Sequence, residues 1–406
     1  MQGHQDLFAK AFGYTRARTA RAEGWYPYFR AIESGAGAEV TIEGRRVIMI
    51  GSNNYLGLTQ HPYVIEKAQK AIAEYGTGCT GSRFLNGNLA LHEELEDRLA
   101  RFMDKPACLV FSTGYQTNLG TIDALAGRHD RVLSDSMNHA SIFDANRLSF
   151  AKSHKIRHND LADLERLLRD NSDVSGGTLV VTDGVFSMEG DLADLEGIAQ
   201  LRRRYGFRLM IDDAHGVGVM GPTGRGTAEH FGVEDSADLI MGTFSKSLAS
   251  IGGFIVAEPE VIDFVKHHSR ALIFSASPPP AAVAAVIGAL DVIEAEPERR
   301  RILWENVEKM RTGFQEIGLD TGPSVTPVIP LVIGEEEDTF SFWNALFDAG
   351  IFTNPIVPPA VPPGRCLLRT SYMATHTPEM LDHVLEVVAA VAEHVGVSAA
   401  TAASAR

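Results

Sequence analysis

From about residue 50 to residue 290, short apolar runs alternate with longer segments in which apolar residues recur every three or four positions. The short runs are typical of buried strands, and the recurrence at three and four is typical of amphipathic helices. Strands that alternate with helices indicate βαβ units, so we expect an α/β fold with a mostly parallel central sheet. The predicted strands are 109–111, 178–182, 208–211, 239–242 and 253–257, and the predicted helices are 62–75, 91–102, 115–126 and 192–205.

A run of three prolines at 278–280 separates this region from the rest of the chain. Helical patterns then follow at 281–295 and 299–317, strand patterns at 328–333 and 366–370, and a final helical pattern at 378–394. The first residues mix charges with aromatic side chains, which is typical of an arm that packs on another domain or subunit. We therefore expect an N-terminal helix and arm (1–50), a large domain (51–290), a smaller C-terminal α/β domain (291–396) and a disordered tail (397–406).

Charge and cysteine content exclude several classes of protein. The 406 residues include 37 Lys and Arg against 52 Asp and Glu, a formal net charge of −15, which repels nucleic-acid phosphates. Cys79, Cys108 and Cys366 are too widely spaced for a disulfide framework or a zinc site, which favours a reducing compartment. The most apolar stretch, 281–290, has half of the roughly 20 residues that a membrane span needs, and the N-terminus has no apolar signal core. We expect a cytoplasmic protein, with at most peripheral contact with the inner face of the membrane.

Charged residues and histidines come directly after several apolar runs. Residues 208–211 lead into Asp212, Asp213 and His215, and residues 239–242 lead to Lys246. His139 follows another apolar run at 132–133. Because the carboxyl ends of parallel strands meet at one edge of a sheet, where open α/β sheets bind their ligands, we expect these side chains to share a site.

This combination of side chains suits pyridoxal phosphate. A lysine forms a Schiff base with it, a carboxylate keeps its pyridine nitrogen protonated, and a flat ring stacks on its face. Residues 112–118 begin a predicted helix directly after the strand 109–111, and the N–H groups at a helix N-terminus bind phosphate. A metal site on Asp212, Asp213 and His215 is the weaker alternative, because no further ligand has a recognisable spacing, and we expect no metal.

Seven segments of the chain together form an ordered pattern. They are GSNNYLGL (51–58), STGY (112–115), NHAS (138–141), GVFSMEGD (184–191), DDAHG (212–216), GTFSKS (242–247) and LR (368–369) with ATHT (374–377). This order resembles that of the α-oxoamine synthases, which are pyridoxal-phosphate enzymes of the fold type I aminotransferase superfamily. These enzymes join an amino acid to an acyl thioester with loss of carbon dioxide. The resemblance covers about residues 25–395, and it implies fold type I architecture and a homodimer with its site at the subunit interface.

The resemblance also implies roles for individual residues. Lys246 matches the Schiff-base lysine, and Asp212 matches the partner of the pyridine nitrogen. His215, with Ser187 nearby, matches the histidine that hydrogen-bonds the phenolic oxygen of the cofactor. His139 matches the histidine that stacks on the ring and later steers the acyl group.

Two further groups of residues match the family pattern. Arg369 resembles the arginine that receives the substrate carboxylate, a task for which a planar guanidinium is suited, and Asn53 resembles the asparagine that assists it. The residues that match the phosphate cradle are Gly114, Tyr115, Thr243 and, contributed by the second subunit, Ser275.

Within the family, residues 75–87 (YGTGCTGSRFLNG) are the most discriminating segment, and they resemble the serine palmitoyltransferase branch. That branch condenses L-serine with palmitoyl-CoA to 3-ketodihydrosphingosine, CoA and carbon dioxide, the first step of sphingolipid synthesis. One departure concerns Val357, which stands where some bacterial members carry an arginine that holds the carboxylate. Arg369 must then receive the carboxylate without that second arginine.

Other functions share parts of this pattern. A relative that uses alanine or glycine, or takes its acyl group from a carrier protein as in 8-amino-7-oxononanoate synthase-like enzymes, stays open, because pocket depth rather than residue type sets acyl length. A transaminase would share Lys246 and Asp212 but would need no thioester. A non-catalytic partner subunit would lack Lys246.

Overall fold

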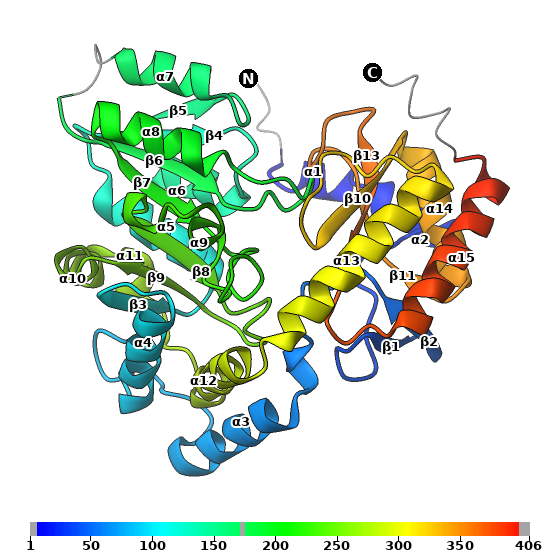
Figure 1. Ribbon diagram of the computed structural model, residues 1–406, viewed down its shortest axis with the longest axis horizontal. Helices are drawn as coiled ribbons and strands as arrows, with labels where there is room; N and C mark the ends of the chain where they lie inside the picture. The colour runs from blue at the N-terminus through cyan, green and yellow to red at the C-terminus, as the bar shows by residue number, and fades with distance from the viewer. Residues whose placement is uncertain (1–5, 171–174, 398–406) are drawn as a thin grey trace.

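The computed structural model describes residues 6–170 and 175–397. Its largest element is a seven-stranded sheet in the order β3-β9-β8-β7-β6-β4-β5 (Figure 1). All neighbouring strands pair in parallel except β9, which lies antiparallel between β3 and β8. The predicted mostly parallel sheet is confirmed, and each predicted strand is present. The strands are β3 (Ala107–Phe111), β4 (Arg131–Asp135), β5 (Lys152–Ile156), β6 (Thr178–Asp183), β7 (Arg208–Asp212), β8 (Leu239–Thr243) and β9 (Gly253–Ala257).

Both faces of this sheet are buried, because apolar side chains occupy successive positions of the strands and therefore point to alternate faces. In β7, Leu209 and Ile211 belong to one hydrophobic cluster and Met210 to the other. One face is covered by α5 (Gly114–Leu125), α6 (Ala140–Leu148), α10 (Pro259–His268) and α11 (Arg270–Ile273). The other is covered by α4 (Ala90–Phe102), α7 (Leu161–Arg169), α8 (Leu195–Tyr205) and α12 (Pro280–Ala295).

The predicted helices of this region are confirmed, with one error at a boundary. Helix α8 begins at Leu195, so the predicted start at 192 is three residues too early. Leu192 instead pairs with Val185 in an isolated bridge, and Asp194 caps the helix by accepting the N–H of Gly197 at 2.9 Å. The remaining helices of the region are α3 (Pro62–Tyr75), α9 (Thr227–Phe231), η1 (Leu58–Gln60) and η2 (Glu234–Ser236).

The C-terminal part contains a three-stranded sheet in the order β10-β13-β12. Both predicted strands and all three predicted helices after residue 280 are confirmed, whereas α14, β11 and β12 were not predicted. The elements are β10 (Val328–Gly334), β11 (Ile351–Phe352), β12 (Asn354–Ile356), β13 (Cys366–Ser371), α13 (Glu298–Ile317), α14 (Glu336–Asp348) and α15 (Pro378–Val395). Helix α13 runs obliquely from the side of the large sheet to the C-terminal part (Figure 1).

The N-terminal segment has two short helices, α1 (Ala9–Phe12) and α2 (Arg16–Ala22), and then a hairpin that the sequence did not predict. The hairpin strands are β1 (Glu39–Ile42) and β2 (Arg45–Met49). Its two turn residues, Glu43 and Gly44, have φ of 54° and 71°, which two-residue hairpin turns favour. Strand β2 pairs in parallel with β11, so the N-terminal segment is attached to the C-terminal part.

The predicted division at residues 50, 290 and 396 stays a proposal. The boundary at 290 falls inside α12, which continues to Ala295. The predicted tail lies outside the described residues except for Val397.

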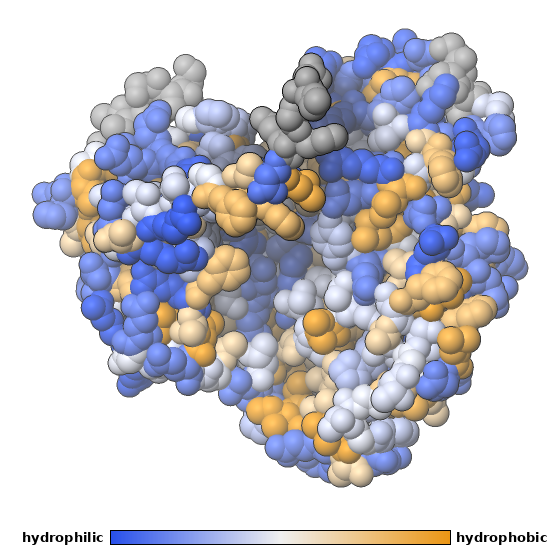
Figure 2. Space-filling view, turned by 180° about the vertical axis from the view of Figure 1, so that it is seen from behind, coloured by the Kyte–Doolittle hydropathy of each residue, from blue (hydrophilic) through white to orange (hydrophobic). Residues whose placement is uncertain are grey.

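Seen from behind, the surface is hollowed between the large sheet and the C-terminal part (Figure 2). The three cysteines are free thiols, two of them buried. Among the helices of the described ranges, none combines the length and the apolar character that a membrane span requires.

Candidate active site

A cavity of about 340 Å³ lies at the carboxyl edge of the large sheet. Its walls come from the segments that follow β3, β4, β6, β7 and β8 and from the one that precedes β9, because the antiparallel β9 starts where its neighbours end. Most residues that the sequence predicted for the site line it. These are Lys246, Asp212, His215, His139, Gly114, Tyr115, Ser187 and Thr243.

Asp212 ends β7 with its side chain buried and held on both oxygens. Oδ2 accepts the side-chain N–H of Asn118 at 2.7 Å, and Oδ1 accepts the backbone N–H of Ala214 at 3.1 Å. Asn118 also donates to Ser141 Oγ at 2.9 Å. The sequence reasoning missed Asn118, although it lies one helical turn after Gly114 and therefore on the same face of α5.

Asp183 is a second buried acid, and the sequence reasoning missed it as a site residue. It pairs in register with Asp212 on the adjacent parallel strand and lines the same cavity. Its Oδ1 accepts the backbone N–H of His139 at 3.3 Å. Burial, and then the neighbouring Asp212, raise the pKa of the Asp183 carboxyl well above its usual range, which favours its neutral form. The signal was available, because Asp183 ends its strand just as Asp212 does.

Lys246 follows β8, and its amine shares the cavity with these acids. Burial lowers the pKa of Lys246 to about 8, although Asp212 acts in the opposite direction and Arg369 adds to the lowering. A large share of the amine is therefore neutral slightly above physiological pH, and only a neutral amine is nucleophilic or basic.

His139 caps the N-terminus of α6, with its ring held by Ser141. Nδ1 accepts the backbone N–H of Ser141 at 3.3 Å and lies 2.7 Å from its Oγ. Burial lowers the pKa of His139, with a partly opposing effect of Asp212. We therefore assign the neutral tautomer with its proton on Nε2, which can donate one hydrogen bond.

His215 lies against Tyr55, whose hydroxyl is 2.7 Å from Nδ1 of His215 and 3.3 Å from Oδ1 of Asn53. Burial lowers the pKa of His215 well below its usual range, and the cationic Lys246 and Arg369 lower it further. The sequence reasoning did not assign Tyr55 a role, although it lies within the segment 51–58 that it had singled out.

Arg369 reaches the site from β13, in the C-terminal part. Its Nε donates to the backbone carbonyl of Ser187 at 2.6 Å, and its Nη2 donates to Oδ1 of Asn53 at 2.9 Å. Neither Arg369 nor Asn53 is among the residues that line the cavity, but Ser187 is. The guanidinium has five N–H donors, so these two bonds leave donors for an anion beside the cavity.

Residues 45–388 match the family model of the class I and II aminotransferases. The chain belongs to this family. A serine palmitoyltransferase of Bacteriovorax stolpii is 51% identical over 387 residues, which cover 95% of this chain and 92% of that protein. An 8-amino-7-oxononanoate synthase of Geotalea daltonii is 43% identical over 93% of this chain and 97% of that protein.

The solved structures agree with this assignment. A high-resolution structure of serine palmitoyltransferase with a pyridoxal-phosphate internal aldimine has a TM-score of 0.94 and 35% identity, covering 97% of this chain and all of that one. The predicted membership of the α-oxoamine synthases and the fold type I architecture are confirmed. The protein is thus a pyridoxal-phosphate-dependent acyltransferase of the serine palmitoyltransferase class.

The side chains and glycines of this aminotransferase-family site fit pyridoxal phosphate. Thr113 caps α5 by accepting the N–H of Gln116 at 3.1 Å. A Cβ on Gly114 would lie 2.7 Å from Thr243 Oγ1, and a Cβ on Gly253 would lie 2.7 Å from Cα of Gly114. The two glycines therefore let the N-terminus of α5 lie close against the ends of β8 and β9, at the edge of the cavity, where its backbone N–H groups can receive the phosphate.

Ser275 is the one predicted cofactor contact that does not lie at the cavity of its own chain. It sits after α11, where its Oγ accepts the side-chain N–H of Gln116 at 3.0 Å. A contact between Ser275 and the cofactor of a second subunit stays a prediction.

Asp212, Asp213 and His215, the ligands of the alternative metal site, are not grouped around a common point. Asp213 points away from Asp212, with its Oδ2 accepting the backbone N–H of Thr227 at 2.6 Å. Burial raises the pKa of the Asp213 carboxyl to about 7. Across the described ranges, no group of three or more His, Cys, Asp or Glu side chains is placed to hold a metal ion.

The lowered pKa of Lys246 predicts how the apoenzyme takes up pyridoxal phosphate. The rate of uptake is expected to rise with pH through a midpoint near 8, because the protonated amine that dominates below this pH cannot attack the aldehyde. Stopped-flow absorbance between pH 6 and pH 10 would measure it, with free lysine as the reference amine. A midpoint above 10, where an ordinary lysine titrates, would contradict the role of burial.

Proposed function

We propose that the enzyme condenses L-serine with a long-chain acyl-CoA, palmitoyl-CoA, to give 3-ketodihydrosphingosine, CoA and carbon dioxide. The observation that carries the proposal is the position of Arg369, a buried guanidinium with free donors beside the cavity that contains Lys246. An α-amino acid offers both groups that this pair requires, a carboxylate for Arg369 and an α-amino group next to Lys246. The 51% identity with a serine palmitoyltransferase supports the choice of serine.

The cofactor and Lys246 divide the first chemical task. Pyridoxal phosphate, when bound, withdraws electrons from the α-carbon of the amino acid. Lys246 Nζ, as a neutral amine, takes the α-proton, and the carboxylate of Asp212 keeps negative charge at the base of the cavity. Asn118 and the N–H of Ala214 hold that carboxylate in place.

The second task is the attack of the α-carbon on the acyl thioester. A new carbon–carbon bond forms as the bond between the acyl carbon and sulfur breaks, and the thiolate takes a proton to leave as the thiol. The carboxylate is later lost as carbon dioxide, and the α-carbon takes up a proton in its place, for which protonated Lys246 is the nearby donor. His139 donates its Nε2 proton as a hydrogen bond to the acyl oxygen, where negative charge develops. Arg369 keeps the carboxylate fixed until it leaves.

A related synthase activity is the second candidate, with alanine or glycine as the amino acid or a carrier-protein thioester as the donor. The 43% identity with an 8-amino-7-oxononanoate synthase supports it. Both candidates use the same residues for the same steps. They differ in the side chain of the amino acid and in the acyl carrier.

The proposed assembly is a homodimer, in which Ser275 of the partner subunit completes the phosphate site. Peripheral contact with a membrane would bring the enzyme to its acyl substrate.

The test is a spectroscopic titration of the holoenzyme with serine, alanine and glycine, followed by acyl-CoA of increasing chain length and detection of the released thiol. We expect serine to give the highest kcat/KM with long acyl chains, by at least about tenfold, since discrimination by one hydroxyl group lies in this range or above. A preference for alanine, or thiol release only from a carrier-protein thioester, would favour the second candidate. Conversion of the cofactor to its amine form by amino acid alone would indicate a transaminase.

A further inference from the structure

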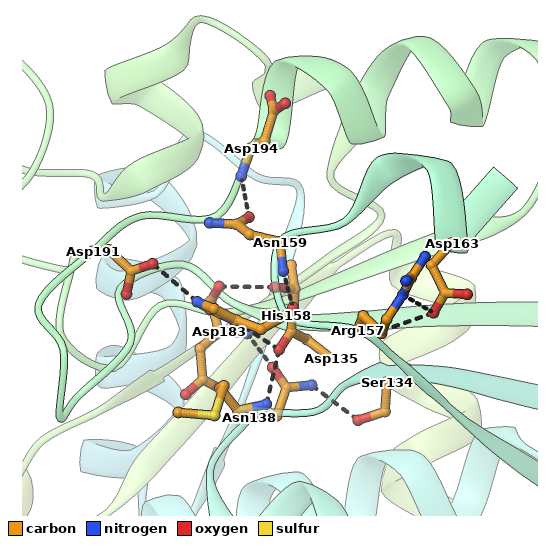
Figure 3. A network of polar contacts seen from close by, with 12 residues as sticks. Ser134, Asp135, Asn138, Arg157, His158, Asn159, Asp163, Asp183, Asp191 and Asp194 are labelled. Atoms are coloured by element: carbon orange, nitrogen blue, oxygen red, sulfur yellow. Dashed lines mark hydrogen bonds and ion pairs between the residues drawn. The ribbon is translucent and has the colours of Figure 1, made fainter. Parts of the chain in front are cut away.

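An ion-paired histidine lies just behind the active site, in a network that the proposed mechanism does not use (Figure 3). His158 comes two residues after β5, the edge strand of the large sheet. Its Nδ1 lies 3.0 Å from Asp135 Oδ1, and its Nε2 lies 3.0 Å from Asp191 Oδ2. The ring also packs edge-on against Phe186, with 4.4 Å between the ring centroids.

Both ring nitrogens of His158 therefore face carboxylates, and only the doubly protonated ring can donate to both. Burial works against the charged ring, but the hydrogen bonds to Asp135 and Asp191 outweigh it and raise the pKa of His158 to about 10. The acid Glu189 also interacts electrostatically with the ring, while the side chain of the adjacent Arg157 forms ion pairs with other acids, Asp160 among them. The imidazolium thus connects the segments at the ends of three strands: Asp135 ends β4, His158 itself follows β5, and Asp191 follows β6.

The first connection leads from His158 to His139. Asp135 accepts the backbone N–H of Met137 at 2.8 Å and that of Asn159 at 2.9 Å, so the same carboxylate shapes the turn that carries His139. Asn138 fixes this turn to β6 by donating to the carbonyl of Val181 at 2.8 Å.

The second connection leads from His158 to Arg369. Residues 186–191 form a compact turn, in which the N–H of Phe186 donates to the carbonyl of Asp191 and the N–H of Gly190 donates to the carbonyl of Phe186. Within this turn, Ser187 follows Phe186 and supplies the backbone carbonyl that accepts the N–H of Arg369 Nε at 2.6 Å. His158 contacts this turn at both ends, through Phe186 and through Asp191.

We propose that His158, as the imidazolium, is a positioning residue. It holds the turn that carries His139 and the turn of residues 186–191 at fixed positions relative to each other, so that the cofactor ring and the substrate carboxylate are correctly placed with respect to one another. The inference rests on the roles proposed above for His139 and Arg369. It does not depend on which amino acid or thioester the enzyme uses.

The test compares His158→Gln with the wild-type holoenzyme, without any thioester. Glutamine can donate to one carboxylate but carries no charge and cannot span both. We expect a changed visible circular-dichroism band of the bound cofactor and a dissociation constant for the amino acid that is about 10- to 100-fold higher, because small displacements of positioning groups cost this much. His267→Gln is the matched control, since His267 forms an exposed ion pair with Asp263 on α10.

A second variant adds a pH-dependent readout. In Asp191→Asn, His158 keeps one carboxylate, so its pKa should fall toward the ordinary value. The dissociation constant of the amino acid for Asp191→Asn, divided by that for wild type, should then grow as pH rises from 6.5 to 9. The reason is that only the variant loses the charge of its His158 imidazolium in this range. The comparison with wild type cancels the titration of the free amino acid.

The outcomes separate positioning from simple stabilisation. If His158→Gln lowers only the thermal stability, and both its circular-dichroism band and its amino-acid affinity match those of wild type, the inference is wrong. A ratio for Asp191→Asn that stays constant with pH would also overturn it. Because the titration uses whichever amino acid changes the spectrum, a failure of serine would count against the proposed function and not against this inference.

Discussion

The variant Lys246→Ala is expected to lose both the visible absorbance of the bound cofactor and the decarboxylative condensation. The side chain has two proposed tasks, to join the cofactor covalently and to take the α-proton, and alanine can do neither. Loss of a positioned base alone costs about 10²- to 10⁴-fold, so turnover should fall by at least about 10³-fold. Absorbance spectra of the purified variant and thiol release in the presence of serine and palmitoyl-CoA would measure both losses.

The control for this variant is Lys70→Ala, because Lys70 is an exposed lysine on α3 that pairs with Glu66 on the same helix. It should keep both the spectrum and the turnover of wild type. If Lys246→Ala kept the internal-aldimine band with no amino acid or other amine added, the cofactor would be joined to another lysine and the assignment of the site would be wrong.

The position of most site residues could be predicted from the sequence for a local reason. A parallel strand that ends in a polar residue delivers that residue to the sheet edge, so Asp212 and Lys246 could be placed without knowledge of the packing. The same rule would have found Asp183, which ends its own strand in the same way. His139 was found through the apolar pair before it.

Residues that meet the site through long-range packing could not be placed in this way. Arg369 and Asn53 come together from segments 316 residues apart, and their hydrogen bond depends on how β13 meets the start of the large domain. Only the family resemblance pointed to them. The hairpin β1–β2 was missed because its stability comes partly from the distant β11 rather than from its own short strands.

The ionisable side chains of the site do not all carry charge. This explains how several of them can be buried close together. Burial lowers the pKa of His215, and the cationic Lys246 and Arg369 lower it further, so this ring stays neutral. Of the two acids in register, Asp183 is driven toward its neutral form by burial and by Asp212. Asp212 is the acid whose two oxygens both accept N–H donors, so it is the carboxylate placed to carry charge.

Because Asp212 is the acid placed to carry charge, we expect a large loss of activity in Asp212→Asn. The amide keeps the size and one oxygen acceptor of the carboxylate but removes its charge. Its NH2 group must also face one of the two N–H donors that the carboxylate accepts, from Asn118 or from Ala214. A protonated pyridine nitrogen would lose its counter-ion, so the cofactor would withdraw electrons less strongly. We expect kcat for condensation to fall by about 10²- to 10³-fold, the usual cost of one preorganised electrostatic partner, while the cofactor stays bound through Lys246.

A second readout of Asp212→Asn does not involve turnover. Asp212 raises the pKa of Lys246 against the effect of burial, so its removal should move the midpoint for cofactor uptake by the apoenzyme below the value near 8 expected for wild type. The matched control is Asp213→Asn, the adjacent buried acid that faces Thr227 instead of the cavity, and its kcat and uptake midpoint should stay close to those of wild type. If Asp213→Asn lost turnover as strongly as Asp212→Asn, or if the midpoint of Asp212→Asn did not move, the charge at the base of the cavity would have to be reassigned.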